Sequence, residues 1–259
     1  MITFFRRLRK TLIGEGNIRK PALPAGRYLL YAIGEILLVV IGILIALQVN
    51  NWNEERKNRA LADKHLETIR LNLEDDIAQA ENLLLETETA IEYANIFFEQ
   101  FKTLRAIDNN VQMYLLYLMF EREIEVNKSG MNALLSTNGM SSVNEQLQPK
   151  LLEYYRHIEQ LKRREENANT EIKTMFEPYV KANYYWIYNI TNPWHRQIEY
   201  YKDDPRPLDD IDQKLRSIIN DKQMEMMVVG RIYQARVLAD FYSMSIELAE
   251  DIISDIGNK

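Results

Sequence analysis

The sequence predicts an all-α protein in which one N-terminal transmembrane helix precedes an elongated antiparallel helical bundle with coiled-coil-like packing. Three observations support this prediction: a single long apolar run near the N-terminus, seven-residue repeats of apolar residues after it, and a shortage of turn-forming residues. The 259 residues include only 9 Gly and 7 Pro, which favours long helices over many short strands. The expected organisation is a basic segment 1–27, a transmembrane helix 28–49 and an extracytoplasmic helical bundle 50–259.

The apolar run YLLYAIGEILLVVIGILIALQV, residues 28–49, contains one charged residue, Glu35. About 20 apolar residues in a helix cover the ~30 Å hydrocarbon layer of a bilayer. Tyr28, Tyr31 and Trp52 lie where interfacial aromatic residues are expected. The alternative is a cleavable signal peptide, but that would have a shorter run and a small-residue cleavage site. Because QVNNWNEE follows instead, we predict an uncleaved anchor.

The charges flanking the run predict its orientation. Seven bases precede it and none occurs in residues 50–55, although Arg56, Lys57 and Arg59 reduce the contrast. The positive-inside rule then places the N-terminus in the cytoplasm. The anchor would lie in the inner (cytoplasmic) membrane, and the C-terminal domain in the periplasm of a two-membrane bacterium.

The basic segment and the remainder of the chain differ in charge. The net charge is −6, yet residues 1–27 carry seven bases and one acid, so the other residues sum to −12. An acidic body argues against nucleic acid as a partner. The leading segment MITFFRRLRKTLIG is typical of a short helix lying among lipid headgroups, although a flank that only sets the topology explains it equally well. The basic residues that would contact anionic lipid are Arg6, Arg7, Arg9 and Lys10.

A glutamate inside the apolar run needs a physical explanation, because an ionisable group at that depth costs a few kcal/mol. Glu35 shares one helical stripe with Gly42, Ala46 and Val49, and small residues let two helices approach closely. We prefer self-association through this stripe. Two alternatives remain: a protonated or snorkelling glutamate with no partner, and ion or proton translocation, for which a single acid offers no relay.

Apolar residues recur every 3.5 residues after Asn53, which indicates near-parallel helix packing. We expect helices at about 53–105, 110–127, 144–190, 208–220 and 222–256, with residues 128–142 as a connection and Pro178 kinking the third helix or ending it early. The first seam comprises Leu66, Leu73, Ala80, Thr87, Ala94 and Phe101, with Ile77, Leu84, Ile91 and Phe98 as its second row. The second comprises Leu147, Leu151, Tyr154, Ile158, Leu161, Glu165, Ala168, Ile172 and Met175, with Glu165 the one charged member. The third comprises Val228, Ile232, Ala235, Ala239, Tyr242, Ile246, Ala249, Ile253 and Ile256.

No motif in the sequence fixes a reaction. His65, His157 and His195 are isolated, and no P-loop, G-x-S-x-G or dinucleotide-binding pattern occurs. The absence of cysteine excludes disulfides, thiolate zinc sites and cysteine nucleophiles. We therefore expect no catalytic residue, no cofactor and no metal site, while a metal site assembled from distant acids remains an alternative. Neighbouring acids are interpreted as solvated faces: Asp75-Asp76, Glu165-Glu166 and Asp203-Asp204.

Aromatic residues crowd into the stretch 179–201. A helix cannot bury four near-consecutive aromatic residues on one stripe, so part of 184–188 is expected at the surface. Exposed aromatic residues of this kind bind peptides, glycans or partner proteins. Two alternatives are that residues 192–207 fold back over them and that they face the membrane. The candidate partner or ligand surface comprises Tyr184, Tyr185, Trp186, Tyr188 and Trp194.

The run YAIGEILLVVIGILIALQVNNWNEERK resembles the N-terminal signature of an uncharacterised family of bacterial single-pass membrane proteins, catalogued as a domain of unknown function. The segment SGMNALLSTNGMSSVNEQLQPKLLEYYRHIEQL is similar to that family's central Ser-Gly loop and following Tyr-Tyr helix, so the resemblance covers most of residues 1–165. It implies the single-pass topology and no activity. It also implies a shared design that includes Glu35, Asn50, Asn51, Trp52 and the Ser129-Gly130 turn.

These observations favour a non-enzymatic cell-envelope protein, anchored in the membrane, that acts as a scaffold or partner-binding subunit and is oligomeric. The alternative is an extracytoplasmic ligand-sensing module. It would signal through a separate protein, because a cytoplasmic part of residues 1–27 is too short for a signalling domain. An enzyme is the weakest alternative. The expected partners are membrane lipids and either a second copy of the chain or another membrane protein.

Overall fold

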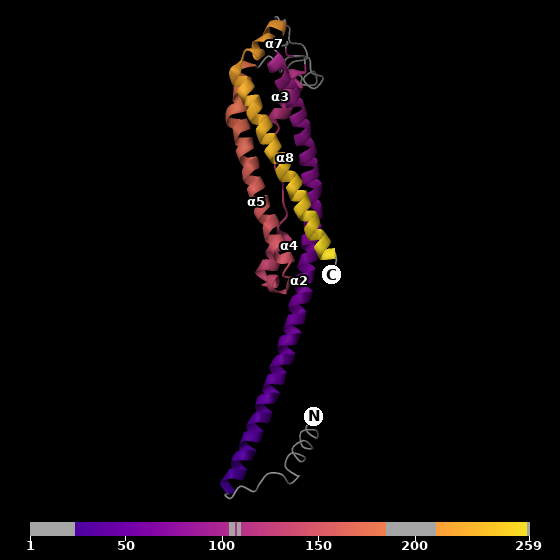
Figure 1. Ribbon diagram of the computed structural model, residues 1–259, viewed down its shortest axis with the longest axis vertical. Helices are drawn as coiled ribbons and strands as arrows, with labels where there is room; N and C mark the ends of the chain where they lie inside the picture. Colours follow the sequence, from indigo (N-terminus) through magenta and orange to yellow (C-terminus); the bar gives the residue numbers. More distant parts are fainter. Residues whose placement is uncertain (1–23, 104–106, 108–109, 185–210, 258–259) are drawn as a thin grey trace, which may run out of the picture. The chain divides into compact units, whose positions relative to one another are not determined.

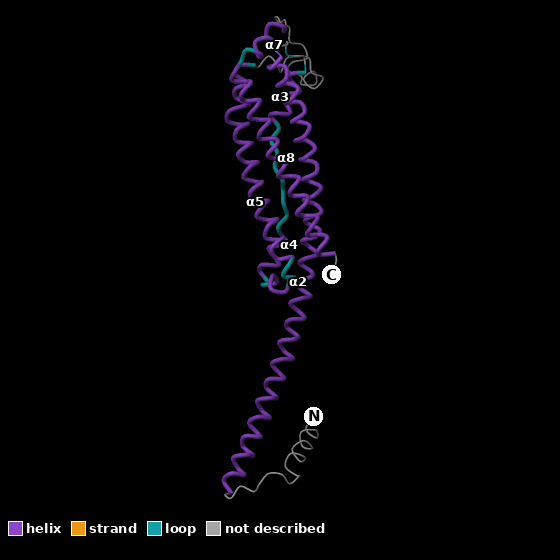
Figure 2. The backbone as a smooth tube through the Cα atoms, viewed as in Figure 1, coloured by secondary structure: helices purple, strands orange, loops and turns teal. Residues whose placement is uncertain are grey.

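The computed structural model describes residues 24–103, 107, 110–184 and 211–257 (Figure 1). All regular elements in these residues are helices and none is a strand, as the sequence predicts (Figure 2). The chain divides into two compact units, residues 1–57 and residues 58–259. Helix α2 (Pro24–Thr103) contributes to both.

In the first unit, α2 contains the predicted apolar run. Every described side chain from Ala32 to Trp52 is exposed, and the mean hydropathy of an 18-residue window reaches 2.6. This part of the helix is long and apolar enough to cross a membrane.

The second unit contains the rest of α2 and the helices that pack with it (Figure 1). They are α3 (Val111–Met119), α4 (Ser129–Ser136), a 3₁₀ turn (Gly139–Ser142), α5 (Leu147–Glu171), a π-helical turn (Ile172–Phe176), α6 (Glu177–Asn183), α7 (Ile211–Ile219) and α8 (Lys222–Gly257). One hydrophobic cluster joins α2, α5 and α8. A second joins the end of α2 to α3, α6, α7 and the start of α8.

The first predicted seam is correct in one row and wrong in the other. All six residues from Leu66 to Phe101 in the first row are buried. The second row, Ile77 to Phe98, is only half-buried, and the opposite flank of α2 is buried in its place through Ile69, Asp76 and Phe97. That flank contains polar residues that bind backbone groups, so counting apolar residues favours the wrong side.

The second predicted seam holds until the π-helical turn. Leu147 to Ile172 are buried at the predicted spacing, but Met175 is 58% exposed and Phe176 is buried instead. A π-helical turn adds one residue to a helix, which moves the seam forward by one position. Pro178 follows this turn at the start of α6, and the helix ends at Asn183, short of the predicted residue 190.

Residues 120–127 were expected to continue a helix and do not. Residues 120–128 form a non-helical stretch between α3 and α4, hereafter the connecting segment, which runs along the bundle (Figure 2). The expected connection after it is largely helical, because it forms α4 and the 3₁₀ turn. Without a helix or a neighbouring strand, the connecting segment needs other partners for its backbone polar groups.

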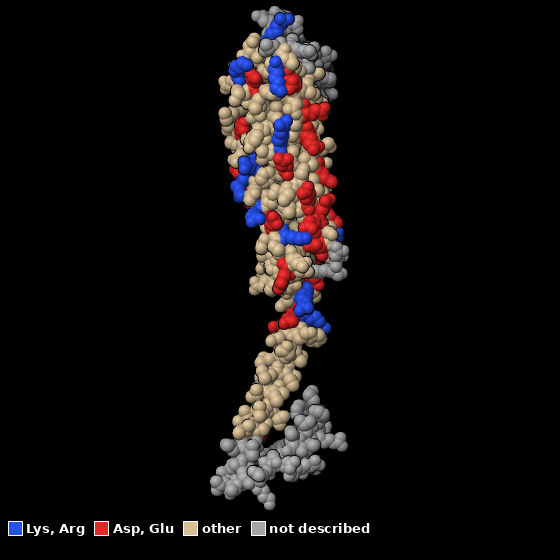
Figure 3. All heavy atoms as spheres, viewed as in Figure 1, with Lys and Arg blue, Asp and Glu red and all other residues tan. Residues whose placement is uncertain are grey.

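Acidic residues dominate the part of α2 that lies in the bundle. From Leu71 to Phe101 the helix carries eight acidic residues and no Lys or Arg, and acidic side chains follow this part of the unit in Figure 3.

Candidate functional site

The candidate site is built around Glu165, the one charged residue in the α5 seam. Its neighbours at seam spacing are Leu161 and Ala168, so helical geometry points the glutamate at the core, where it is 1% exposed. The Tyr242 hydroxyl of α8 donates to Glu165 Oε1 at 2.7 Å, and the Ile124 backbone N–H donates to the same atom at 3.0 Å. The other oxygen, Oε2, is buried and has no hydrogen-bond partner in the described structure. Burial raises the pKa of Glu165, because it disfavours the charged form.

Asp76 on α2 repeats this arrangement. The Tyr154 hydroxyl of α5 donates to Asp76 Oδ2 at 2.8 Å, and the Asn127 backbone amide also bonds to this carboxylate. Asp76 is 1% exposed, and burial raises its pKa to about 6. Each carboxylate therefore joins a tyrosine of the next long helix to the backbone of the connecting segment.

Amide side chains bind the remaining backbone groups of this segment. Asn169 of α5 accepts from the Arg122 N–H at 3.2 Å and donates to the Arg122 carbonyl at 2.9 Å. Gln79 of α2 makes the equivalent pair with Glu125, at 3.1 and 3.0 Å. The connecting segment is thus held by α5 on one side and by α2 on the other.

Two buried arginines bind main-chain oxygens nearby. Arg231 donates to the carbonyls of Leu118 and Ala168, each at 3.2 Å, and Arg122 donates to the carbonyls of Phe120 and Glu86, each at 3.1 Å. Burial lowers the pKa of Arg231 to about 10. In these bonds both guanidinium groups donate to main-chain carbonyls, while the charge of Glu171 acts on Arg231 and that of Glu86 acts on Arg122.

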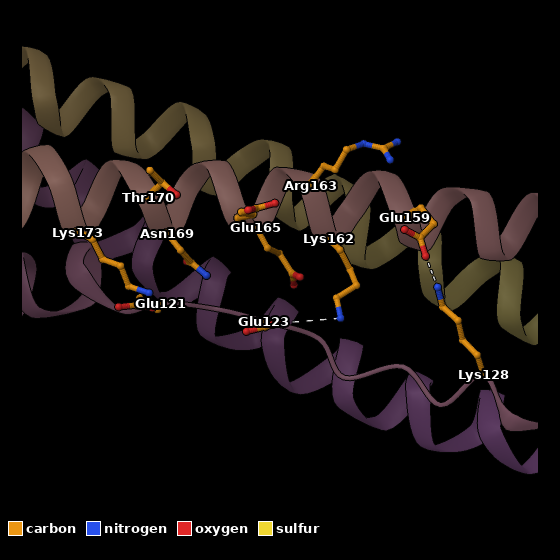
Figure 4. A pocket seen from close by; sticks show the side chains of 11 residues that line it. Glu121, Glu123, Lys128, Glu159, Lys162, Arg163, Glu165, Asn169, Thr170 and Lys173 are labelled. Atoms are coloured by element: carbon orange, nitrogen blue, oxygen red, sulfur yellow. Dashed lines mark hydrogen bonds and ion pairs between the residues drawn. The ribbon is translucent and has the colours of Figure 1, made fainter.

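A polar groove of about 700 Å³ lies between α5 and the connecting segment (Figure 4). Three ion pairs cross from one wall to the other: Lys173 to Glu121 at 2.6 Å, Lys162 to Glu123 at 4.0 Å, and Lys128 to Glu159. Glu165 also lines the groove. Charges of both signs therefore line the groove, and its three lysines pair with glutamates of the opposite wall.

The four residues of the predicted association stripe lie on α2. Glu35, Gly42, Ala46 and Val49 are exposed, as is every described side chain from Ala32 to Trp52, so exposure does not distinguish the stripe from its neighbours. The basic residues proposed for the membrane surface, Arg6, Arg7, Arg9 and Lys10, lie outside the described residues.

The predicted aromatic surface receives one correction. Tyr184 is 5% exposed, because its ring packs beside Tyr179 and its hydroxyl donates to Asp221. Tyr184 therefore does not contribute to a surface. Tyr185, Trp186, Tyr188 and Trp194 lie outside the described residues.

The prediction that neighbouring acids lie on solvated faces is wrong for one member of each described pair. Asp75 and Glu166 are exposed as expected, whereas Asp76 and Glu165 are buried. The described histidines stay apart: His157 bonds to the Phe241 carbonyl at 3.0 Å and stacks on its ring. No cluster of three acidic or histidine side chains suited to a metal ion occurs in the part of the chain that the structure describes.

One sequence signal for the site was overlooked. In EREIEV, residues 121–126, the alternate residues Arg122 and Ile124 are buried, while Glu121, Glu123 and Glu125 are exposed. A period of two is the pattern of an extended chain and not of a helix. In the sequence alone this alternation is visible at Ile124 and Val126, while the burial of Arg122 is seen only in the structure.

With the geometry established, the chain can be compared with known proteins. Residues 35–117 match DUF6090, a family of unknown function. The DUF6090 match confirms the resemblance to an uncharacterised family and includes Glu35, Trp52 and Asp76. It ends before the connecting segment and α5, so Glu165 and the groove lie outside the matched residues. Neither the curated proteins nor the solved structures contain a match.

Proposed function

We propose that this protein is a non-enzymatic, membrane-anchored cell-envelope protein that acts as a scaffold or partner-binding subunit and self-associates. The observation that supports the proposal is the composition of α2. One uninterrupted helix carries an exposed apolar run, residues 32–49, and then a buried seam that starts at Ala62. This helix contributes to both compact units of the chain.

In the proposed topology the N-terminus is cytoplasmic and residues 50–259 are periplasmic, in accord with the positive-inside rule. Alkaline phosphatase fused at the C-terminus is active only outside the cytoplasm. We expect activity from this fusion, and a cytoplasmic reporter active at the same position would refute the topology.

Self-association is proposed to run through Glu35, Gly42, Ala46 and Val49. Crosslinking and native mass measurement of the full chain in detergent should show an oligomer, and Glu35→Ala combined with Gly42→Leu should shift it towards the monomer. Gly34→Leu is the matched control, because Gly34 lies about 100° around the helix from Glu35. If the double variant keeps the wild-type oligomeric state, the stripe is not the contact.

A second candidate function, ligand sensing outside the cytoplasm with the signal passed to a separate protein, is favoured by the groove. Its support is the groove of about 700 Å³, whose walls present charged side chains of both signs.

A further inference from the structure

The part of α2 that belongs to the second unit has an exposed stripe of apolar residues. Leu71 and Leu85 are 52% and 64% exposed and lie two seven-residue repeats apart, with the exposed Ala78 midway between them. Seven residues return a helix to almost the same side, so these three side chains form one row, hereafter the leucine row. Single exposed leucines are normal on a protein surface, whereas a row at constant spacing forms a surface that a second helix can follow.

A row of glutamates, hereafter the acidic row, runs beside the leucine row. Glu74, Glu81 and Glu88 are exposed, and each follows a member of the leucine row by three residues. Glu74 binds Arg70, whereas neither Glu81 nor Glu88 takes part in an ion pair within the described part of the chain. Because α2 carries no Lys or Arg from Leu71 to Phe101, the helix itself supplies no base to this row (Figure 3).

The two rows occupy the positions of one strand of a coiled coil. In a heptad written abcdefg, the leucine row stands at d, the acidic row at g, and Asp75, Asn82, Thr89 and Ile96 at a. In coiled coils, charged residues at e and g pair across the interface and select the partner, and an asparagine at a fixes the register. Ile96 is 41% exposed and the other a residues are polar, so much of the recognition must come from charge.

A second copy of this stripe does not complement the pattern. In a parallel pair, the acidic row would meet the e row of the other helix, which contains Gln79, Glu86 and Tyr93 and no base. In an antiparallel pair, the acidic row would meet itself. Like charges placed together disfavour such a contact. The pattern therefore selects a different chain, with lysine or arginine beside its apolar seam.

We propose that the exposed face of α2 binds a basic amphipathic helix of another protein by coiled-coil packing. Apolar side chains of that helix pack on Leu71 and Leu85, and its basic side chains pair with Glu81 and Glu88. The acidic excess of the chain after residue 27 attracts such a helix over a longer range. This inference rests on the partner-binding function proposed above and defines the chemistry of the partner.

The absence of cysteine from the chain makes a direct test possible. Ala78→Cys places a single thiol in the leucine row, and Gln160→Cys places one at an exposed position of α5 as the matched control. Each full chain, in detergent, is labelled with a maleimide in the presence and absence of a synthetic helix. This peptide has four heptads, roughly 28 residues, with leucine at d, isoleucine and asparagine at a, and lysine at e and g.

We expect the peptide to protect the thiol of Ala78→Cys and not that of Gln160→Cys. At a peptide concentration about ten times the dissociation constant, labelling of Ala78→Cys should slow roughly tenfold. Two control peptides should give no protection. One has glutamate in place of every lysine, and the other has the same composition in a shuffled order without the heptad spacing.

Substitutions in the Ala78→Cys chain test the two rows separately. Leu85→Ser should raise the dissociation constant roughly tenfold, and Glu81→Gln combined with Glu88→Gln should raise it roughly fivefold. Leu152→Ser removes a leucine of α5 that is 54% exposed and should leave binding unchanged. All these positions are exposed, and circular dichroism checks that each variant remains helical.

Three results would overturn the proposal: the peptide protects neither thiol, it protects both equally, or either control peptide protects Ala78→Cys as well as the basic peptide does. Leu85→Ser and Leu152→Ser with equal affinity would also overturn it. None of these results changes the oligomeric state of the Glu35 and Gly42 variants, so anchoring and self-association are judged separately.

Discussion

The Tyr154 hydroxyl on α5 donates a 2.8 Å hydrogen bond to Asp76 Oδ2 on α2, and both side chains are 1% exposed. Tyr242 and Glu165 form the same contact between α8 and α5 at 2.7 Å. In each pair the carboxylate also accepts a hydrogen bond from a backbone N–H of the connecting segment. Two tyrosine–carboxylate pairs thus attach one non-helical segment to three helices.

Asp76 makes the stability of the bundle depend on pH. Burial raises its pKa from 3.8 to about 6, against the lowering effect of the bonds from Tyr154 and Asn127. Between about pH 4 and pH 6 the folded chain therefore binds a proton that the unfolded chain does not. The contribution of Asp76 to the free energy of unfolding is largest below this window and decreases as the pH rises through it.

Asp76→Asn should remove this dependence, since the amide oxygen can still accept from Tyr154 and Asn127. We expect urea unfolding midpoints, measured from pH 4 to pH 7.5, to fall less steeply with pH in the variant than in the wild type. Asp75→Asn, at the exposed neighbour, should keep the wild-type slope. Parallel profiles for the wild type and Asp76→Asn would contradict the assignment.

Asn169 is predicted to stabilise the bundle through the main chain of Arg122. Asn169→Leu keeps a similar volume but leaves the buried N–H and C=O of Arg122 without partners. The expected loss is about 3 kcal/mol in the free energy of unfolding, measured by urea denaturation. Asn167→Leu is the control, because Asn167 is exposed on the same helix and should cost little. Similar losses in both variants would show that these backbone bonds are not the cause.

The π-helical turn predicts an unusual tolerance to deletion. Removing the exposed Thr174 brings Phe176 to the spacing that the α5 seam requires after Ile172, so an ordinary helix can replace the turn. We expect this deletion to preserve the helical circular dichroism spectrum and the cooperative melting. Deleting Asn167 instead rotates the following seam residues by about 100° away from the core and should abolish cooperative melting. Equal damage from both deletions would refute the register argument.

Gly130 is predicted to be indispensable at the contact between α4 and α2. A Cβ atom there would lie 2.8 Å from the Ile69 backbone nitrogen, a clash that a side-chain movement cannot relieve. Gly130→Ala should destabilise the bundle by about 2 kcal/mol, measured as a lower thermal midpoint. Gly230→Ala meets only Glu171 Oε1 at 3.7 Å and should stabilise α8 by up to about 1 kcal/mol. A neutral Gly130→Ala would show that α4 can move away from α2.

The sequence predicts the long helices well because the spacing of apolar residues follows directly from which helix face is buried. Thr87 and Glu165 were placed in seams by spacing alone, and both are buried. The same reasoning failed at Met175, since a one-residue insertion changes no local composition. It also failed at Asp76, which looks like a solvated acid until Tyr154 and Asn127 are seen beside it.

The groove could not be predicted for a related reason. Its two walls come from distant parts of the sequence, because the partners in the three ion pairs lie 31 to 52 residues apart. No pattern in either part of the sequence predicts that the two will meet. In the sequence Glu165 is an exception to an apolar repeat and one of a pair of neighbouring acids. Its bonds to Tyr242 and Ile124 come from residues far away in the sequence.

The connecting segment also resists slippage. In an ordinary sheet, a strand that moves along its neighbour finds an equivalent peptide group two residues further on. Here the anchoring groups are two carboxylates and two carboxamides at fixed places on the helices, and Asn169 and Gln79 each bind both the N–H and the C=O of a single residue. In any other register these hydrogen bonds would not form, so the connecting segment has a single stable register.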